Sequence, residues 1–279
     1  MTRILVTNDD GVAAPGIRAL ARAAAGDFEV VVAAPSQEAS GMSAALTAVV
    51  SDGQIVVSPY DMPGITAFGV AASPAYIVVL AALGAFGPPP DLVLSGINRG
   101  ANAGRAVLHS GTVGAALTAA NHGLRALAVS LDVLNPELDV VNPGLDVLNP
   151  EAAPATGGSA IVVPADEVLH WETAARTAAT LFEPLLSAPP ATVLNLNVPD
   201  RVSVRGLREA ALAAFGQAQV AIAEAGEGFV RTRIERSGEQ LTPGTDLALL
   251  AEGYATVTAL RPPAGTSGVR IPAQRRASS

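Results

Sequence analysis

Cysteine is absent from this sequence of 279 residues. Its absence excludes disulfide bonds, thiolate nucleophiles and zinc sites built on cysteine, and it leaves the redox compartment undetermined. Aromatic residues contribute only 4% and charged residues only 15% of the chain. The interior must therefore be filled largely by alanine, valine and leucine, which favours close packing of helices on a sheet.

Positive charge is scarce as well. The chain has 17 arginine and lysine residues against 25 aspartate and glutamate residues, and its formal net charge is −8. Because nucleic-acid backbones are held by clustered cations, this balance argues against a nucleic-acid polymer as a partner. If the substrate is an anion, a metal ion must supply the attraction.

Long hydrophobic runs are missing too, although 49% of the residues are hydrophobic, enough to bury a large core in one domain or in a domain with an appendage. Residues 62–90 carry no charge, but prolines and glycines divide them into segments shorter than the roughly 20 residues that a bilayer requires. We expect a buried strand and helix there, and no membrane partner. The first residues begin a strand without the basic and apolar regions of a signal peptide, so we expect a cytoplasmic protein.

Short β-branched runs alternate with alanine-rich stretches of helical length from Ile4 to about Ser130. This alternation is typical of βαβ units and predicts an α/β protein with a parallel sheet. The predicted strands are Arg3–Thr7, Glu29–Ala34, Leu92–Ser95, Ala126–Ser130 and Thr192–Val198, with short hairpin strands at Ala48–Ser51 and Gln54–Ser58. The predicted helices are Pro15–Ala25, Ser73–Ala85, Gly111–His122, Val168–Leu186 and Leu247–Ala251.

A tandem repeat interrupts this order. Three similar units of seven residues follow one another at Leu131–Glu137, Leu138–Gly144 and Leu145–Glu151. Each unit contains Asn-Pro, which breaks a helix before the proline, so the period does not indicate a coiled coil. The units also lack the glycines and ligand density of calcium-binding repeats. We predict an exposed loop insertion that continues into a linker at Ala152–Ala160, and a frayed tail after Arg261.

Two adjacent carboxylates, Asp9 and Asp10, follow the first predicted strand. Active sites of open α/β sheets collect at this end of the strands. Two like charges so close repel one another unless a cation lies between them, and oxygen ligands suit Mg²⁺ or Mn²⁺. The alternative is a solvated turn, because Asn8-Asp9-Asp10-Gly11 is also good turn chemistry.

Three further segments combine small hydroxyl and amide side chains with glycine, and each lies after a predicted strand or before a predicted helix. A parallel sheet would bring them to the same rim as Asp9. The helix start at Ser110 offers free backbone N–H groups for an anion, although a plain helix cap explains it as well. The segments lack the dinucleotide-binding fingerprint and the P-loop lysine. They are Pro35–Gly41, Ser95–Gly104 and His109–Gly114.

Histidine 109 is the one histidine near this rim, where it is a candidate general acid or phosphate contact, or else an ordinary loop residue. His122 and His170 are interpreted as cap and packing residues. No nucleophile elbow or Ser-His-Asp order indicates a serine hydrolase.

Taken in order, the motifs resemble the survival-protein SurE family of metal-dependent 5′/3′-nucleotidases. The resemblance covers most of the chain except the repeat and the tail. The matching motifs are Ile4–Gly11, Ala14–Ile17, Ala34–Pro35 with Ser40–Gly41, Ser95–Asn98 with Gly100 and Asn102, Ser110–Val113, Asn195–Pro199, Gly244–Asp246 and Gly253–Tyr254.

The resemblance implies a Rossmann-like, three-layer core over residues 1–200, with 131–160 as an insertion. Residues 201–279 would form a hairpin and a C-terminal segment exchanged in a homodimer or homotetramer. One divalent cation per subunit, Mn²⁺ or Mg²⁺, would be held by Asp9, Asp10, Ser40 and Asn98. Asp9, Asp10 and Asn8 would be catalytic, and the phosphate would be positioned by Asn8, Asn102, Ser110, Gly111 and Thr112, with His109 beside it.

Two positions depart from the family pattern. Tyr76 stands in Ala72–Ile77 where the family usually has an aspartate, and His109 stands where it commonly has tyrosine. These changes bear on the nucleoside pocket more than on the metal site.

The sequence therefore predicts a phosphomonoesterase that hydrolyses nucleoside 5′- and 3′-monophosphates, with short polyphosphate as a further candidate substrate. In this hypothesis a water activated by the cation attacks phosphorus, and Asp9 is the better candidate to orient or deprotonate it. The alternatives are a metal-dependent transferase, or a metal- and nucleotide-binding module with reduced catalysis.

Overall fold

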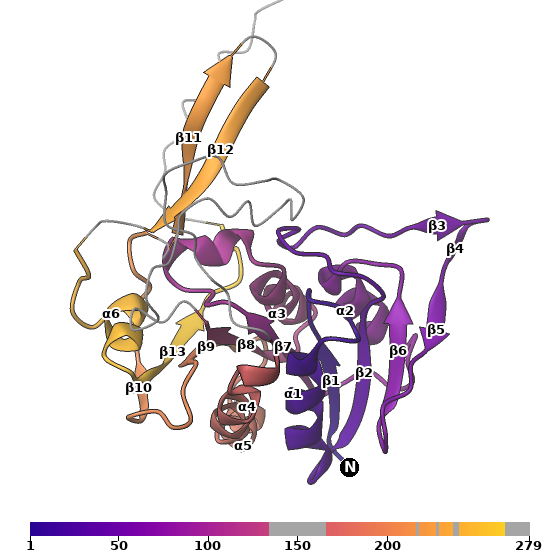
Figure 1. Ribbon diagram of the computed structural model, residues 1–279. Helices are drawn as coiled ribbons and strands as arrows, with labels where there is room; N and C mark the ends of the chain where they lie inside the picture. Colours follow the sequence, from indigo (N-terminus) through magenta and orange to yellow (C-terminus); the bar gives the residue numbers. More distant parts are fainter. Residues whose placement is uncertain (134–165, 216–217, 227–228, 237–239, 266–279) are drawn as a thin grey trace, which may run out of the picture.

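A computed structural model describes residues 1–133, 166–215, 218–226, 229–236 and 240–265 (Figure 1). The strands are β1 Arg3–Thr7, β2 Glu29–Pro35, β3 Val50–Ser51, β4 Gln54–Ile55, β5 Val57–Pro59, β6 Thr66–Val70, β7 Leu92–Arg99, β8 Arg125–Asp132, β9 Val193–Pro199, β10 Leu207–Glu209, β11 Ala218–Gly226, β12 Phe229–Arg236 and β13 Ala255–Leu260. The α-helices are α1 Pro15–Ala25, α2 Pro74–Ala82, α3 Gly111–Asn121, α4 Trp171–Ala179, α5 Phe182–Ser187 and α6 Asp246–Ala251, and short 3₁₀ helices cover Gly104–His109 and Asp166–Val168.

Nine strands form the main sheet in the order β10-β13-β9-β8-β7-β1-β2-β6-β5. The six strands from β9 to β6 are parallel to one another, which confirms the predicted parallel sheet. From β1 the chain builds outward through β2 to β6, then returns and builds outward on the other side from β7 to β9. The direction of winding therefore reverses between β1 and β7, and ligands of open α/β sheets bind at such a switch point.

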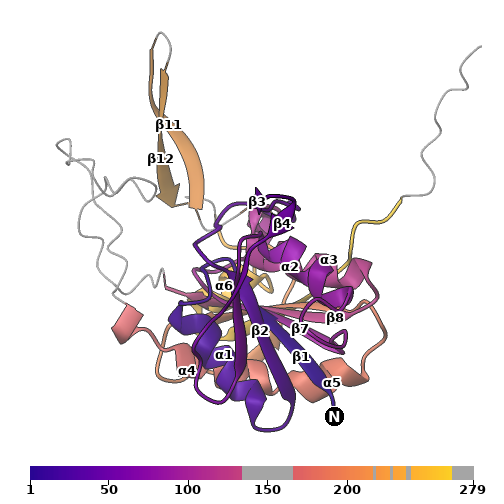
Figure 2. The same ribbon diagram turned by 90° about the vertical axis from the view of Figure 1, so that its right-hand side faces the viewer.

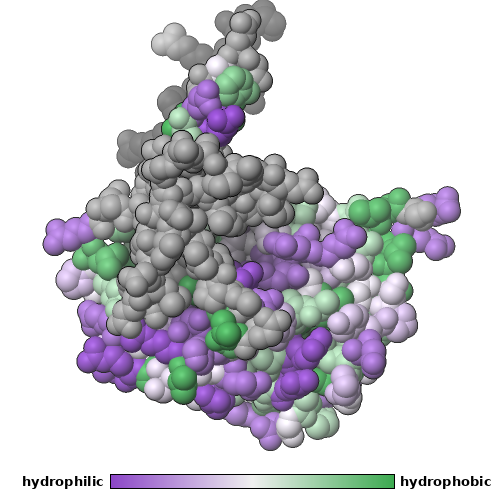
Figure 3. All heavy atoms as spheres, in the orientation of Figure 1, coloured by the Kyte–Doolittle hydropathy of each residue, from purple (hydrophilic) through white to green (hydrophobic). Residues whose placement is uncertain are grey.

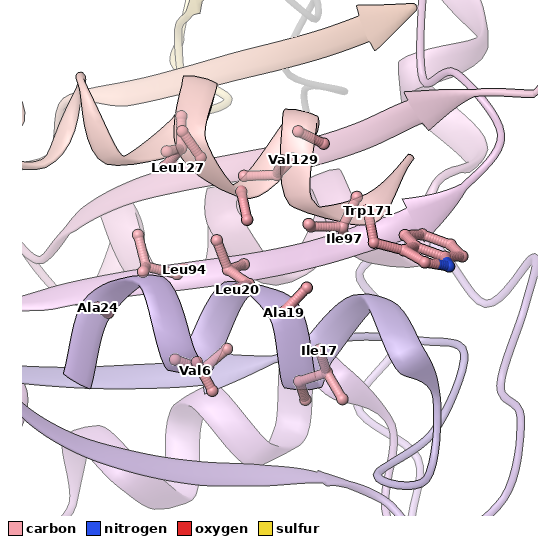
Figure 4. Close-up of a cluster of buried hydrophobic side chains, with 14 of the residues drawn as sticks. Val6, Ile17, Ala19, Leu20, Ala24, Leu94, Ile97, Leu127, Val129 and Trp171 are labelled. Carbon is pink, nitrogen blue, oxygen red and sulfur yellow. The ribbon is translucent and has the colours of Figure 1, made fainter. Parts of the chain in front are cut away.

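Helices cover both faces of the sheet, so that the core has three layers: helices, sheet and helices (Figure 1). Side chains alternate along β1, so Ile4 and Val6 join a core cluster with α1, α4 and α5, whereas Leu5 joins a second cluster with α2 and α3. Figure 4 shows the first cluster, where Ile17 and Leu20 of α1 meet strand side chains and the tryptophan of α4. Alanines fill much of both interfaces, as the low aromatic content predicts.

Local chemistry explains where the helices begin. Pro15 opens α1 at a position where a missing N–H costs nothing. Ser73 and Ser110 cap α2 and α3, because their hydroxyl oxygens accept the backbone N–H of Tyr76 and Val113.

Two predicted elements differ from the structure. The single helix predicted at Val168–Leu186 is wrong: it divides into α4 and α5. Pro184 has no N–H to donate, which suits only the first turn of a helix, so a new helix starts at Phe182. Strand β7 runs to Arg99 instead of ending at Ser95, and its pairing with β8 shifts register between Ser95 and Asn98.

The uncharged stretch at 62–90 contains β6 and α2, which confirms the strand and helix predicted there. The predicted hairpin exists as β3 and β4, with Val50 opposite Ile55. The residues after it form β5, which pairs with β6 at the edge of the main sheet.

Part of the 201–279 region belongs to the main sheet, because β13 pairs with β9 and β10 pairs with β13. The hairpin of β11 and β12 extends away from the sheet (Figures 1 and 2). Leu131 and Asp132 end β8, whereas the rest of the repeat and the linker, in 134–165, and the tail from 266 lie outside the described residues. No helix among the described residues is long and apolar enough to cross a bilayer.

Candidate functional site

The two adjacent carboxylates lie at the switch point, directly after β1. Asp9 is only 4% exposed, which does not fit the alternative of a solvated turn. The hydroxyl of Thr112, in the first turn of α3, donates to its Oδ1. A Cβ at Gly111 would lie 2.7 Å from Oδ2 of Asp9, so only glycine gives this carboxylate room. The fold thus holds the Asp9 carboxylate in contact with the N-terminus of α3.

Asp10 faces the neighbouring strand across the switch point. Its Oδ2 accepts the backbone N–H of Arg99 at 3.3 Å, at the end of β7. Asn98 lies one residue earlier in β7, and its amide nitrogen donates to the carbonyl oxygen of Gly100 at 2.8 Å. Its side-chain oxygen is the atom with which it would ligate a cation.

Burial and repulsion both act on this pair. Burial raises the pKa of Asp9, and the hydrogen bonds from Thr112 oppose that rise. Burial, and then the charge of Asp9, raise the pKa of Asp10 to about 7, with smaller contributions from Glu38 and Asp166. A cation between the carboxylates would relieve both effects.

The described residues contain no cluster of three or more His, Cys, Asp or Glu side chains that could hold a metal. A cation at this rim therefore needs neutral oxygens in addition to the two carboxylates. The hydroxyl of Ser40 and the amide of Asn98 are ligands of that kind, and carboxylates with neutral oxygens form the hard donor set that Mg²⁺ and Mn²⁺ accept. The donor chemistry of the rim fits the predicted ion.

Asn8 braces the loop that carries the pair. Its amide nitrogen donates to the carbonyl oxygen of Gly11 at 2.9 Å. Its Oδ1 is buried and has no hydrogen-bond partner among the described residues. A buried acceptor left in this state is destabilising, and such groups recur at sites that bind ligands.

The loop after β2 reaches the same rim through its backbone. The N–H of Ala39 donates to the carbonyl oxygen of Asp9 at 2.7 Å. Ser40 follows directly; it is exposed, and its hydroxyl donates to Oε1 of Glu38 at 2.8 Å. The loop is therefore anchored at Asp9, while the Ser40 hydroxyl is engaged with a neighbouring carboxylate.

The start of α3 serves as a cap and also lies at the rim. The Ser110 hydroxyl accepts the N–H of Val113 at 3.0 Å. The predicted anion-binding N–H groups at Gly111 and Thr112 lie beside the Asp9 carboxylate. His109 precedes them as the exposed last residue of the 3₁₀ helix Gly104–His109. Tyr76 lies in the first turn of α2, half-buried against the second core cluster.

Asn102 belongs to a polar network that the sequence did not reveal. Its side-chain nitrogen donates to the Ser130 hydroxyl at 2.9 Å, and its backbone N–H donates to Asn197 Oδ1 at 2.8 Å. The side chains of Asn195 and Asn197 donate back to its carbonyl oxygen at 2.8 and 3.0 Å. The motif Asn195–Pro199 was visible in the sequence, but its contact with the loop after β7 was not.

Asp246 is a second buried carboxylate without a predicted role. Its Oδ2 accepts the N–H of Gly104 at 2.7 Å, and its Oδ1 accepts the N–H groups of Ala213 and Leu247, both at 2.9 Å. Gly104 has no room for a side chain, since a Cβ would lie 1.8 Å from the carbonyl oxygen of Phe215. Asp246 thus ties the C-terminal region to the loop after β7.

Comparison with known proteins finds relatives of most of the chain. The family model described as survival protein SurE matches residues 4–221. A 5′/3′-nucleotidase SurE of Erwinia tasmaniensis is 34% identical over 265 residues, which cover 92% of this chain and 89% of that protein. Another, of Photorhabdus laumondii, is 33% identical and covers 94% of this chain and 90% of its own.

A solved structure shows the same fold. The SurE protein from Aquifex aeolicus superimposes with a TM-score of 0.67 at 27% sequence identity, over 92% of each chain. The match of the family model over most of the sequence, the relatives above 30% identity and this fold lead to one conclusion: the chain belongs to the SurE family.

Proposed function

We propose that the protein is a metal-dependent phosphomonoesterase that releases phosphate from nucleoside 5′- and 3′-monophosphates. The observation that carries this proposal is the buried pair Asp9 and Asp10, held between the ends of β1 and β7 and the N-terminus of α3. Relatives of similar length are named as nucleotidases, which supports the same substrate class here.

We propose that one Mg²⁺ or Mn²⁺ ion is held by Asp9, Asp10, Ser40 and Asn98. When bound, such an ion polarises a phosphate oxygen and lowers the pKa of a bound water. The raised pKa values of the two carboxylates support a cation at this position, because a positive charge nearby stabilises the ionised form that burial and mutual repulsion disfavour.

The other steps, which are orienting the water, accepting its proton and binding the phosphate, are assigned to residues of the chain. The Thr112 hydroxyl fixes the Asp9 carboxylate, which orients the attacking water and accepts its proton. The Arg99 N–H keeps Asp10 pointed across the switch point. The first N–H groups of α3, with Ser110 and Asn102, hold the phosphate oxygens.

Three other side chains complete the proposed site. Asn8 supports the turn and offers its unpaired oxygen. His109 and Tyr76 stand at family positions that would face the nucleoside. Attack by water needs no covalent enzyme intermediate.

Asp9→Asn tests the proposal. With Mn²⁺ and nucleoside monophosphates, we expect turnover to fall by about 10²–10⁴-fold, because the amide cannot accept the proton. Asp27→Asn, which changes an exposed carboxylate beyond α1, should leave turnover unchanged. Wild-type turnover by Asp9→Asn would exclude the assigned role.

The same assay separates the two alternatives. Release of phosphate from a simple aryl phosphate, with water as the acceptor, would exclude an obligatory transferase. Tight nucleotide binding without phosphate release across several divalent ions would instead indicate a binding module.

We also propose that the chain forms a homodimer or homotetramer. Three apolar side chains of the β11–β12 hairpin are exposed, Ile222 at 68%, Phe229 at 48% and Val230 at 62%, and such a patch is typical of an interface. A monomeric mass by light scattering at micromolar concentration would contradict this proposal.

A further inference from the structure

A basic groove lies between α1 and α4. Its volume is about 480 Å³, and Arg18 and Arg22 of α1 line it together with Arg176 of α4. Strongly hydrophilic residues lie on the surface over these two helices (Figure 3). The residues assigned above to the cation and the phosphate do not line the groove.

The charge of this groove opposes that of the chain. The chain carries a formal net charge of −8, and all 17 of its arginine and lysine residues are arginine. The groove is lined by three arginines and one carboxylate, Glu172, so its formal charge is +2 with His170 neutral. Arg18 and Arg22 stand four residues apart on α1, a spacing at which like charges destabilise a helix.

The two arginines of α1 lack the contacts that several other arginines make. Arg3 pairs with Glu29, and both Arg205 and Arg208 stack on the ring of Tyr254. Across the part of the chain that the structure describes, Arg18 and Arg22 have no hydrogen bond or ion pair. Their repulsion is therefore left uncompensated within these residues.

Arg176 is partly held in place at the opposite wall. One of its terminal nitrogens donates to the Thr173 hydroxyl at 3.2 Å, and that hydroxyl donates to the carbonyl oxygen of Val202 at 2.9 Å. His170, beside it, places Nδ1 2.9 Å from Oδ1 of Asp200. The α4 wall is therefore ordered by contacts of its own, and the α1 wall carries the uncompensated charge.

We propose that this groove binds a compact anion with two or more phosphate groups, at a site separate from the catalytic rim. Guanidinium groups match phosphate oxygens with paired hydrogen bonds, and three arginines line this groove. A volume of about 480 Å³ suits a ligand of nucleotide size. Inorganic polyphosphate and the phosphate chain of a nucleotide share this chemistry.

The chain supplies its own reporter for the test. Trp171, its single tryptophan, lines the groove and is 8% exposed. Inorganic triphosphate is added to metal-free Asp9→Asn protein in EDTA, so that neither turnover nor a bound cation contributes. We expect a saturable change in tryptophan emission, and one bound triphosphate per chain by equilibrium dialysis.

Substitutions then locate the binding. In the Asp9→Asn background, Arg18→Gln with Arg22→Gln should weaken triphosphate binding by at least about tenfold, which is the loss expected for two charge-assisted contacts. Arg176→Gln should weaken it less. Arg261→Gln, an exposed arginine after β13, is the matched control and should bind as the parent does.

Titration with ATP and with adenosine separates the two ligand sources. Equal affinity for ATP and triphosphate shows that the phosphate chain alone is recognised, whereas tighter binding of ATP identifies a nucleotide site. Adenosine should not bind. The proposal is overturned if dialysis detects no bound triphosphate at millimolar concentration, or if the folded double variant binds it as well as Arg261→Gln does.

Discussion

Asp9 and Asp246 are both buried carboxylates, yet the fold treats them in opposite ways. Asp246 accepts three backbone N–H groups, two of them from distant segments, and faces no neighbouring carboxylate in these contacts. Asp9 stands next to Asp10, and burial raises the pKa of both. Asp246 therefore stabilises the fold, whereas the pair Asp9 and Asp10 destabilises the protein as long as no cation is bound between them. Both carboxylates receive hydrogen bonds, so neither burial nor the number of donors identifies the functional one; the adjacent like charge of Asp10 does.

The largest effect on stability is expected at Asp246. Asp246→Ala leaves three buried N–H groups without an acceptor, so the free energy of unfolding should fall by roughly 3–5 kcal/mol. Urea denaturation measures it. Asp246→Asn keeps one acceptor oxygen and should lose less. If both variants unfold at the wild-type midpoint, the hydrogen bonds of Asp246 do not stabilise the link between the C-terminal region and the loop after β7.

Gly111→Ala tests the contact between α3 and Asp9. The new Cβ would lie 2.7 Å from Oδ2 of Asp9, so the carboxylate must move. We expect nucleotidase turnover to fall about 100-fold, the order of loss that follows a misplaced catalytic group. Circular dichroism should report an intact fold.

Gly26→Ala is the matched control for this substitution. Gly26 has an α-helical φ of −67°, and a Cβ there would meet nothing within 4 Å. Its activity should equal that of the wild type. Equal activity of Gly111→Ala and Gly26→Ala would show that Asp9 does not need its present position.

Asp10→Asn should raise the free energy of unfolding, whereas Asp246→Asn should lower it. The pKa of Asp10 is raised from 3.8 to about 7, so the unfolded chain loses this proton first as the pH rises. Metal-free wild-type protein therefore loses stability between about pH 4 and pH 7, and that loss is complete above pH 7. Below pH 4 both states are protonated and the carboxyl has no effect.

The asparagine variant removes this titration. At pH 8 and without metal, we expect it to be up to about 4 kcal/mol more stable than wild type, because moving a pKa from 3.8 to about 7 corresponds to that free energy, and at pH 4 nearly equal to it. Mn²⁺ should stabilise wild type more than the variant. Thermal melts at both pH values measure this, and a variant less stable than wild type at pH 8 would reverse the comparison.

The smallest effect is expected at Ser110, and it distinguishes a hydroxyl that only caps a helix from one that also binds phosphate. Ser110→Ala removes a hydroxyl that accepts a helix N–H, so it should cost about 1 kcal/mol. Ser73→Ala removes the equivalent cap of α2 and should cost more, because this hydroxyl also accepts the N–H of Thr47 and donates to the carbonyl oxygen of Ala45. Only Ser110 lies at the proposed phosphate site. The KM for nucleoside monophosphates should therefore rise in Ser110→Ala alone, and an equal KM in both variants would leave Ser110 with the role of a cap.

The sequence predicts best the features that depend on neighbouring residues. Helix α1 has the predicted bounds, because Pro15 and the alanine pattern after it are local signals. The meeting of Asp9 with Thr112 is also predictable, since the ends of parallel strands and the starts of their helices share one rim. The roles assigned to these residues as ligands stay predictions.

Features set by distant partners were not predictable. Gly96 and Asn98 indicate a loop in isolation, yet pairing with β8 extends β7 to Arg99. Asn102 contacts Asn197, 95 residues away, and Gly104 contacts Asp246, 142 residues away. No local pattern encodes such contacts, because they depend on which segments the completed sheet brings together.

The strand order also has a consequence for synthesis on the ribosome. Strand β9 ends at Pro199, but its outer neighbour β13 spans Ala255–Leu260. While the intervening residues are being translated, β9 presents a row of unpaired N–H and C=O groups, and an open strand edge is a template for pairing with another chain. The nascent protein is therefore exposed to misassembly for the time needed to add about 60 residues, and it escapes only when the last strand has emerged.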